Sequence, residues 1–112
     1  MLARSSRLHR RTDFRTTTSR GRRISAAGLV LHAQALSDDP ARRVGFVVGR
    51  AVGPAVTRNR VRRRLQHLIA ARLEQLPAGT RLVVRATPAA ADRTFDSLGV
   101  ALDEALAKAY PA

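Results

Sequence analysis

Apolar and polar residues alternate along two segments in the first half of the chain. Residues 24–36 are rich in small and branched apolar side chains with the two-residue period of a β-strand, and residues 44–49 predict a second strand. The turn signal Ser37-Asp38-Asp39-Pro40 lies between them. We therefore expect these segments to pair as an antiparallel hairpin, and the first can divide at Gly28 to give two strands.

A helical period begins after Gly53. From Pro54 to Leu76 the apolar positions form one stripe, which Pro77-Ala78-Gly79 ends: Val61, Leu65, Leu68, Ile69, Leu73 and Leu76. A short strand is expected at residues 82–84, followed by a last helix that Thr94 caps. The inner stripe of that last helix comprises Phe95, Leu98, Leu102, Ala105 and Leu106.

A weaker helix is predicted near the N-terminus. Thr12 is placed to cap it, Asp13 suits the positive end of its macrodipole, and Gly21 ends it after Ser19. Its three consecutive threonines lower its propensity. Residues 1–10 are expected to form a flexible basic arm.

These elements give the order α-β-β-β-α-β-α, an α+β sandwich of helices on a four-stranded sheet within one domain, residues 1–112. Phe46 and Phe95 are expected in the core. Phe14 is placed there only by a narrow margin, because an exposed aromatic beside basic residues can stack on a splayed base.

Charge changes this picture of an ordinary small domain. The 112 residues hold 21 Lys+Arg and 8 Asp+Glu, a net charge of +13. Residues 1–72 contain 17 arginines and three acids, a net charge of +14, whereas residues 73–112 are nearly neutral. Such a charge indicates a polyanionic partner and argues against a small-molecule enzyme that works alone.

The densest charge follows Gly53-Pro54-Ala55-Val56-Thr57. Residues 58–64 contain five arginines, with no acid spaced to compensate them before Glu74. Nucleic acid is the partner we favour. A solvated basic face is the plain alternative, and a membrane-surface helix would need bulky aromatic residues that this segment lacks.

Several chemistries find no support in the sequence. There is no cysteine, so disulfides, thiolate metal sites and thiol nucleophiles are excluded. His9, His32 and His67 show no metal-ligand spacing, and the acidic pairs suit turns and helix ends better than a metal-dependent nuclease. No apolar segment follows the basic start, so a cytoplasmic protein is expected.

The arginine segment resembles the central signature of the protein component of bacterial ribonuclease P. The matching residues are Arg43-Val44-Gly45, Gly49-Arg50, Gly53-Pro54-Ala55-Val56-Thr57-Arg58-Asn59-Arg60 and Arg62-Arg63. Weaker matches lie on either side: Arg7-Leu8, Asp13-Phe14 and Gly21 before the signature, and residues 83–85, Pro88 and Thr94-Phe95 after it. The resemblance covers nearly the whole chain.

The resemblance implies a left-handed β-α-β crossover and a catalytic RNA partner. That RNA would carry the active site and the magnesium ions with which the 5′ leader of precursor tRNA is removed. The chain itself would hold no cofactor, would contact no membrane and would be a monomer when free of RNA.

The resemblance also implies two binding surfaces. The RNA subunit would bind Arg58, Asn59, Arg60, Arg62, Arg63 and Arg64. The leader would bind in a cleft lined by Phe14, His32, Val48 and Arg50.

The chain departs from the family pattern at three positions of the leader site. Thr18 and His32 stand where an aromatic residue is frequent, and Ala51 follows Arg50 in place of a second basic residue. Leader contacts would then rest less on stacking and more on Arg and His.

Two other functions fit the composition. A structural RNA-binding protein of the ribosomal type would also be small and strongly basic, and cofractionation with ribosomes would favour it. A standalone nuclease would cleave precursor tRNA without an added RNA subunit.

Overall fold

The sheet of this protein is mixed, and its order is not the order of the strands along the chain. The computed structural model describes residues 2–111. The strands β1 (Arg22–Ala26), β2 (Leu29–Ala33), β3 (Arg43–Val48) and β4 (Arg81–Ala86) lie in the order β1-β2-β4-β3. The strand β4 pairs antiparallel with β2 and parallel with β3.

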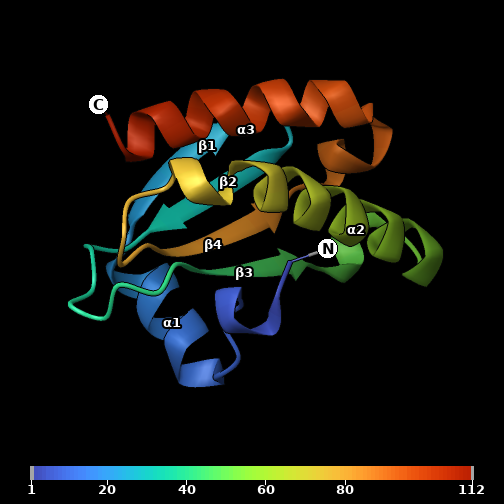
Figure 1. Ribbon diagram of the computed structural model, residues 1–112. Coiled ribbons are helices and arrows are strands. Elements are labelled where there is room, and N and C mark those ends of the chain that lie inside the picture. Colours follow the sequence, from blue (N-terminus) through green and yellow to red (C-terminus); the bar gives the residue numbers. More distant parts are fainter. Residues whose placement is uncertain (1, 112) are drawn as a thin grey trace.

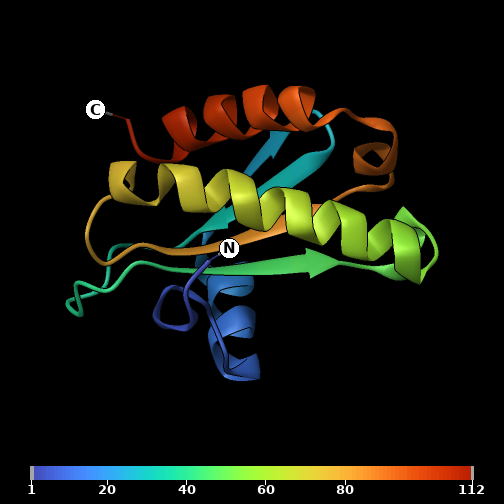
Figure 2. The same ribbon diagram turned by 45° about the vertical axis from the view of Figure 1, so that its right-hand side comes forward.

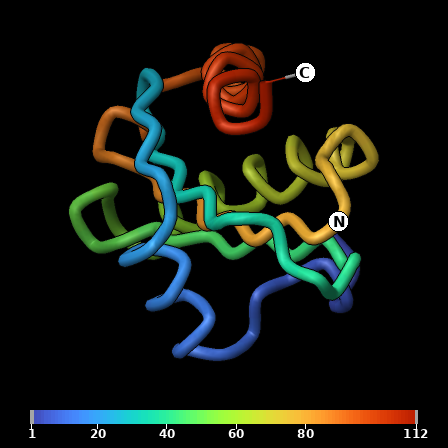
Figure 3. Tube along the Cα trace, turned by 90° about the vertical axis from the view of Figure 1, so that its left-hand side faces the viewer, coloured from blue at the N-terminus to red at the C-terminus, as the bar shows by residue number. Residues whose placement is uncertain are grey.

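Three α-helices cover the two faces of the sheet. The helices α2 (Ala55–Arg72) and α3 (Phe95–Ala109) pack on one face, and α1 (Arg11–Arg20) lies on the other (Figures 1 and 3). Short 3₁₀ turns are η1 (Arg4–Ser6), η2 (Arg50–Val52), η3 (Leu73–Gln75) and η4 (Pro88–Asp92). The predicted α+β class and the order α-β-β-β-α-β-α are confirmed.

The connection from β3 through α2 to β4 has the expected hand. The two strands point the same way, β4 lies above β3, and α2 passes in front of the sheet in Figure 1. This path makes the crossover left-handed, against the strong right-handed preference of parallel connections.

The predicted hairpin is wrong. The strand β2 does not pair with β3, because β4 is inserted between them. The antiparallel hairpin is instead β1–β2, which turns at Gly28 with a φ of 85°. The proposed division at Gly28 is therefore confirmed, with four strands in one sheet.

The helix ends show which local sequence signals correctly predict where a helix begins or ends. Thr94 caps α3 as predicted, its side chain accepting a hydrogen bond from the backbone N–H of Ser97 at 3.0 Å. The predicted cap at Thr12 is wrong, because α1 already begins at Arg11 and its N-cap, Arg10, makes no side-chain cap bond. The long helix gives way to the turn η3 over its last predicted residues.

The main core lies between the sheet and the two helices α2 and α3. Val61, Leu65 and Ile69 of α2 and Leu98 and Leu102 of α3 have no exposed side-chain surface, as the apolar stripes predict. Burial of side chains of this size stabilises the fold by about 1.5–3 kcal/mol each.

The two phenylalanines expected in the core differ from that expectation. Phe46 is only partly buried against the core, and Phe95 is 41% exposed. The prediction for Phe95 is wrong because this residue begins α3, where polar side chains of α2 stand beside it.

Residues 2–10 pass beside β3 on the way to α1 (Figure 2) and meet its free edge at Val44. Arg7 forms a parallel β-bridge with Val44, the N–H of Leu8 donates to the Val44 carbonyl at 3.1 Å, and Leu2 and Leu8 are buried. The segment therefore pairs with this edge at Val44, where the backbone would otherwise be unpaired.

Candidate nucleic-acid interface

The arginines of residues 58–64 lie on the solvent-facing side of α2 and along its borders. Arg63 and Asn59 are exposed, and Arg62 lies beside them, its guanidinium donating to Asn59 Oδ1 at 3.4 Å. Because Val61 and Leu65 anchor the opposite side in the core, the helix presents this basic surface outward.

Three of these arginines are fixed by backbone carbonyls. Arg58 donates to the Gly53 carbonyl at 3.2 Å, Arg60 to that of Ala91 at 3.3 Å and Arg64 to that of Arg93 at 3.1 Å. A guanidinium has five N–H donors, so each retains its charge and further donors for an anion.

None of the five arginines between residues 58 and 64 forms an ion pair within residues 2–111. The first turn of α2 also contains no acidic residue. Since the N-terminal end of a helix carries partial positive charge, these guanidiniums raise the positive potential there. The surface therefore favours a partner that brings several negative charges.

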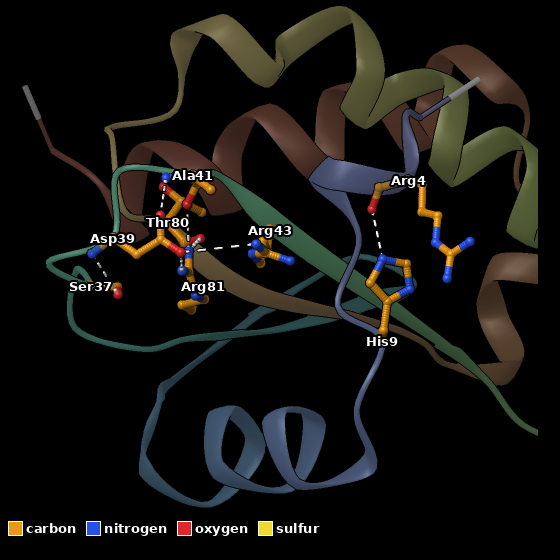
Figure 4. Close-up of polar contacts among 8 residues, drawn as sticks. All are labelled: Arg4, His9, Ser37, Asp39, Ala41, Arg43, Thr80 and Arg81. Carbon is orange, nitrogen blue, oxygen red and sulfur yellow. Dashed lines mark hydrogen bonds and ion pairs between the residues drawn. The ribbon is translucent and has the colours of Figure 1, made fainter.

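Two other arginines share one acidic partner within the protein. Asp39 lies between Arg43 and Arg81, with its Oδ2 atom 3.9 Å and 3.3 Å from their Nη2 atoms (Figure 4). Arg81 also donates to the carbonyls of Ala41 and Thr80. These contacts close the loop between β2 and β3, so the two arginines contribute less to the free basic surface than those of α2.

A second candidate surface lies on the face of the sheet that carries α1. Phe14 of α1 stands directly over Gly45 of β3, where a Cβ would come within 2.3 Å of the ring. Gly45 pairs with Val83, Val83 with His32, and His32 with Arg23, so these residues form one row across the sheet. Phe14 and His32 thus share a face.

His32 lies in a positive environment on this face. Burial, followed by the charges of Arg85 and Arg23, lowers the pKa of its imidazole below the ordinary value of 6.5. Its Nδ1 atom is buried and has no hydrogen-bond partner within residues 2–111. The charges of Arg85 and Arg23 beside this ring favour a partner that brings negative charge. We call Phe14, Arg23, His32, Val47 and Arg85 the outer surface.

The structure corrects the assignment of Val48. Its side chain is 5% exposed and belongs to the core, because alternation along β3 turns it toward α2. Its neighbour Val47 faces the other way, in the row of Arg85 and Val30. Arg50 is exposed in η2, beyond the end of β3, and does not lie in the row of Phe14 and His32.

Sequence reasoning did not identify Arg23 and Arg85 as members of this surface. Both lie in strands and are exposed beside His32. Strand alternation could place each on a face, but their proximity depends on the pairing of β2 with β4.

Two further kinds of site bear on the function of the chain. Within residues 2–111 no three His, Cys, Asp or Glu side chains group closely enough to hold a metal ion. No helix in this described part of the chain is long and apolar enough to span a membrane.

Comparison with known proteins identifies the family of the chain. The family described as Ribonuclease P matches residues 2–110. The chain is 46% identical to the ribonuclease P protein component of Salinispora tropica, with 97% of this chain and 93% of that protein covered. It is 47% identical to the corresponding protein of Acidothermus cellulolyticus, over 96% and 91% of the two chains.

Solved structures agree in fold. The RNase P protein of Staphylococcus aureus superposes with a TM-score of 0.86 at 22% identity, covering 95% of this chain and 96% of that one. That of Thermotoga maritima gives 0.79 at 24% identity, covering 91% and 96%. The family match, the close relatives and the shared fold show that this chain belongs to the ribonuclease P protein family.

Proposed function

We propose that this chain binds the catalytic RNA of ribonuclease P through α2 and the 5′ leader of precursor tRNA through the outer surface. The RNA carries the active site for hydrolysis of the leader. The chain acts as a monomeric accessory subunit in the bacterial cytoplasm, as its family membership suggests.

One observation carries the proposal: the five arginines of residues 58–64 occupy one helix without an acidic partner within residues 2–111. Backbone carbonyls hold three of them in place before any ligand arrives. Guanidinium groups bind phosphate in a bidentate manner, and preorganised donors lose less entropy on binding.

The outer surface suits a single strand. Arg23 and Arg85 offer charge for phosphates, while Phe14 and His32 offer rings on which bases stack. Binding of a single strand by charge and stacking tolerates many sequences, which suits a leader that differs between tRNA precursors. The sheet separates this surface from α2, so both RNAs bind at once.

In this function the magnesium ions are held by the RNA partner. No step is assigned to a metal on the protein, whose described residues form no group of metal ligands. The residues of the chain bind and orient RNA, and they lower the repulsion between its phosphates, where divalent cations also gather.

Reconstituted cleavage of the leader tests this function. The RNA subunit from the same genome, precursor tRNA and magnesium are assayed with the wild-type chain and with Arg63→Ala. We expect the wild type to accelerate cleavage. Arg63→Ala should bind the RNA subunit about 10-fold more weakly, because it removes a charge-assisted hydrogen bond to a phosphate.

Lys108→Ala provides a matched control. This exposed residue carries the same charge but lies in the last turn of α3, at the other end of the helical layer from the arginines (Figure 1). Lys108→Ala should bind the RNA subunit and accelerate cleavage as the wild type does. Equal cleavage with and without the chain would contradict the proposal, and cleavage by the chain alone would support a standalone nuclease.

Leader binding has its own assay. The assembled enzyme should bind precursor tRNA more tightly than the same tRNA without a leader, and Arg85→Ala should reduce this difference. If Arg85→Ala and Lys108→Ala preserve the difference equally, the outer surface is not the leader site.

A further inference from the structure

Phe95 is an exposed aromatic side chain beside the arginines of residues 58–64 of α2. It is the first residue of α3 and is 41% exposed. A hollow of about 330 Å³ joins it to α2, lined by Arg60, Arg63, Arg64, His67 and Phe95. No acidic residue lines it, whereas Asp96 and Asp103 line the adjoining hollow between α2 and α3, which Phe95 also borders.

The position of Phe95 relative to α2 is fixed by hydrogen bonds. Arg60 and Arg64 donate to the carbonyls of Ala91 and Arg93, which closely precede α3. Arg93 in turn donates to Ser97 Oγ at 2.9 Å. The segment leading into α3 lies beside the N-terminal half of α2 in Figures 1 and 2. The ring is thus held beside the guanidiniums without being covered.

Arg60 adds charge and hydrogen-bond donors to the same hollow. Its Nη2 group donates to the Ala91 carbonyl at 3.3 Å, and no acidic side chain forms an ion pair with it within residues 2–111. A guanidinium has five N–H donors, so Arg60 keeps its charge and further donors for an anion. Three arginines and no acid make the hollow complementary to a polyanion.

We propose that Phe95 stacks on one unpaired base of the RNA subunit, with Arg60, Arg63 and Arg64 on the flanking phosphates. The inference rests on the proposed function, because it extends the α2 surface onto α3. The partner is the RNA subunit rather than the leader, since α3, which begins at Phe95, lies on the opposite face of the sheet from α1 and the outer surface. An aromatic ring and guanidiniums together are typical of single-stranded RNA sites.

Substitution at Phe95 separates stacking from simple packing. Phe95→Ala should weaken binding of the RNA subunit about 5- to 150-fold, the range for one stacked base. Phe95→Leu retains bulk but not the ring, so it should bind the RNA subunit as weakly as Phe95→Ala. Phe95→Tyr should bind as tightly as the wild type. Val100→Ala, on the same helix and 59% exposed, is the control and should bind normally. Thermal melts confirm that each variant is folded.

A tryptophan at this position reports the contact directly. The chain contains no tryptophan, so Phe95→Trp introduces a single one, whose emission can be excited apart from that of Tyr110. We expect its emission to be quenched when the RNA subunit is added at physiological salt. Precursor tRNA alone should quench it much less; quenching as strong as with the RNA subunit would overturn the assignment to that partner.

Failure of this inference is distinguishable from failure of the proposed function. If Phe95→Ala or Phe95→Leu binds as the wild type while Arg63→Ala is weak, stacking is refuted and the α2 surface stands. If Arg63→Ala also binds as the wild type, the proposed function itself is refuted. An absence of quenching by the RNA subunit would likewise overturn the stacking contact.

Discussion

At the scale of single residues, Gly45 determines the shape of the outer surface. A Cβ at this position would lie 2.3 and 2.4 Å from two ring carbons of Phe14 and 3.2 Å from Leu8 Cβ. The ring therefore occupies the space that any other residue would fill. The absence of a side chain in β3 is what allows α1 to bring its aromatic residue onto the sheet.

Gly45→Ala should displace the Phe14 ring. Overpacking of this kind costs about 1–3 kcal/mol, so the free energy of unfolding should fall by that amount, and binding of leader-containing tRNA should weaken. Urea denaturation and binding assays measure the two effects. Gly49→Ala is the control, because a Cβ there would meet nothing within 4 Å. Equal stability and affinity of the two variants would refute this role of Gly45.

Two residue-scale predictions failed because one local pattern was not sufficient to place the side chain. The family resemblance places Val48 in the leader cleft, whereas in the structure its side chain lies in the core. Alternation along β3 separates Val47 from Val48, but the sequence alone does not say which of the two faces α1 covers. Phe95 fits the apolar stripe of α3, yet its place in the first turn leaves it beside α2 rather than under the helix.

At the scale of elements, α3 shows how far local signals reach. Its N-cap, Thr94, and its inner residues Leu98 and Leu102 were all apparent in the sequence, because capping and the helical period depend on neighbours a few residues apart. The arginine surface of α2 was predictable for the same reason, since Val61 fixes which side of that helix is buried.

Thr94→Ala should destabilise the protein by about 1 kcal/mol, because the N–H of Ser97 loses its side-chain acceptor. Thr94→Ser retains the hydroxyl and should keep most of the stability. The midpoint of urea denaturation measures both. Equal midpoints for Thr94→Ala and the wild type would show that this cap contributes nothing.

The sheet order was not predictable in the same way. The strand β4 enters the sheet between β2 and β3 after the whole of α2 has intervened. A turn signal such as Ser37-Asp38-Asp39-Pro40 shows that the chain turns, but it does not show which strand becomes the neighbour. Long-range pairing also decides that Arg85 lies beside His32, so part of the outer surface escaped prediction.

At the scale of the whole molecule, a net charge of +13 is placed on a chain of 112 residues. Ion pairs compensate part of it, at Asp39 with Arg43 and Arg81, and at Asp103 with Arg72. The arginines of residues 58–64 have no such compensation within residues 2–111. Repulsion among them lowers the stability of the free protein, and bound anions reduce that repulsion.

Sulfate or phosphate should therefore raise the melting temperature relative to chloride at equal ionic strength. An anion at about ten times its Kd adds about 1.4 kcal/mol, and each kcal/mol raises the melting temperature by about 4–8 °C for a domain near this size. The same anions should raise the melting temperature of the double variant Arg62→Ala/Arg63→Ala less than that of the wild type. This difference separates binding at α2 from general effects of the salts. Identical shifts in both proteins would contradict anion binding at this surface.

The salt dependence of binding to the RNA subunit tests the central claim most directly. With about six phosphate contacts, the logarithm of affinity should fall against the logarithm of salt concentration with a slope of about −4 to −5. Arg62→Ala/Arg63→Ala should make the slope shallower by about one for each phosphate that the variant no longer neutralises, and Lys108→Ala should leave it unchanged. An affinity that stays constant between about 50 and 200 mM salt, or a slope that is the same in all three proteins, would contradict RNA binding through the arginines of α2.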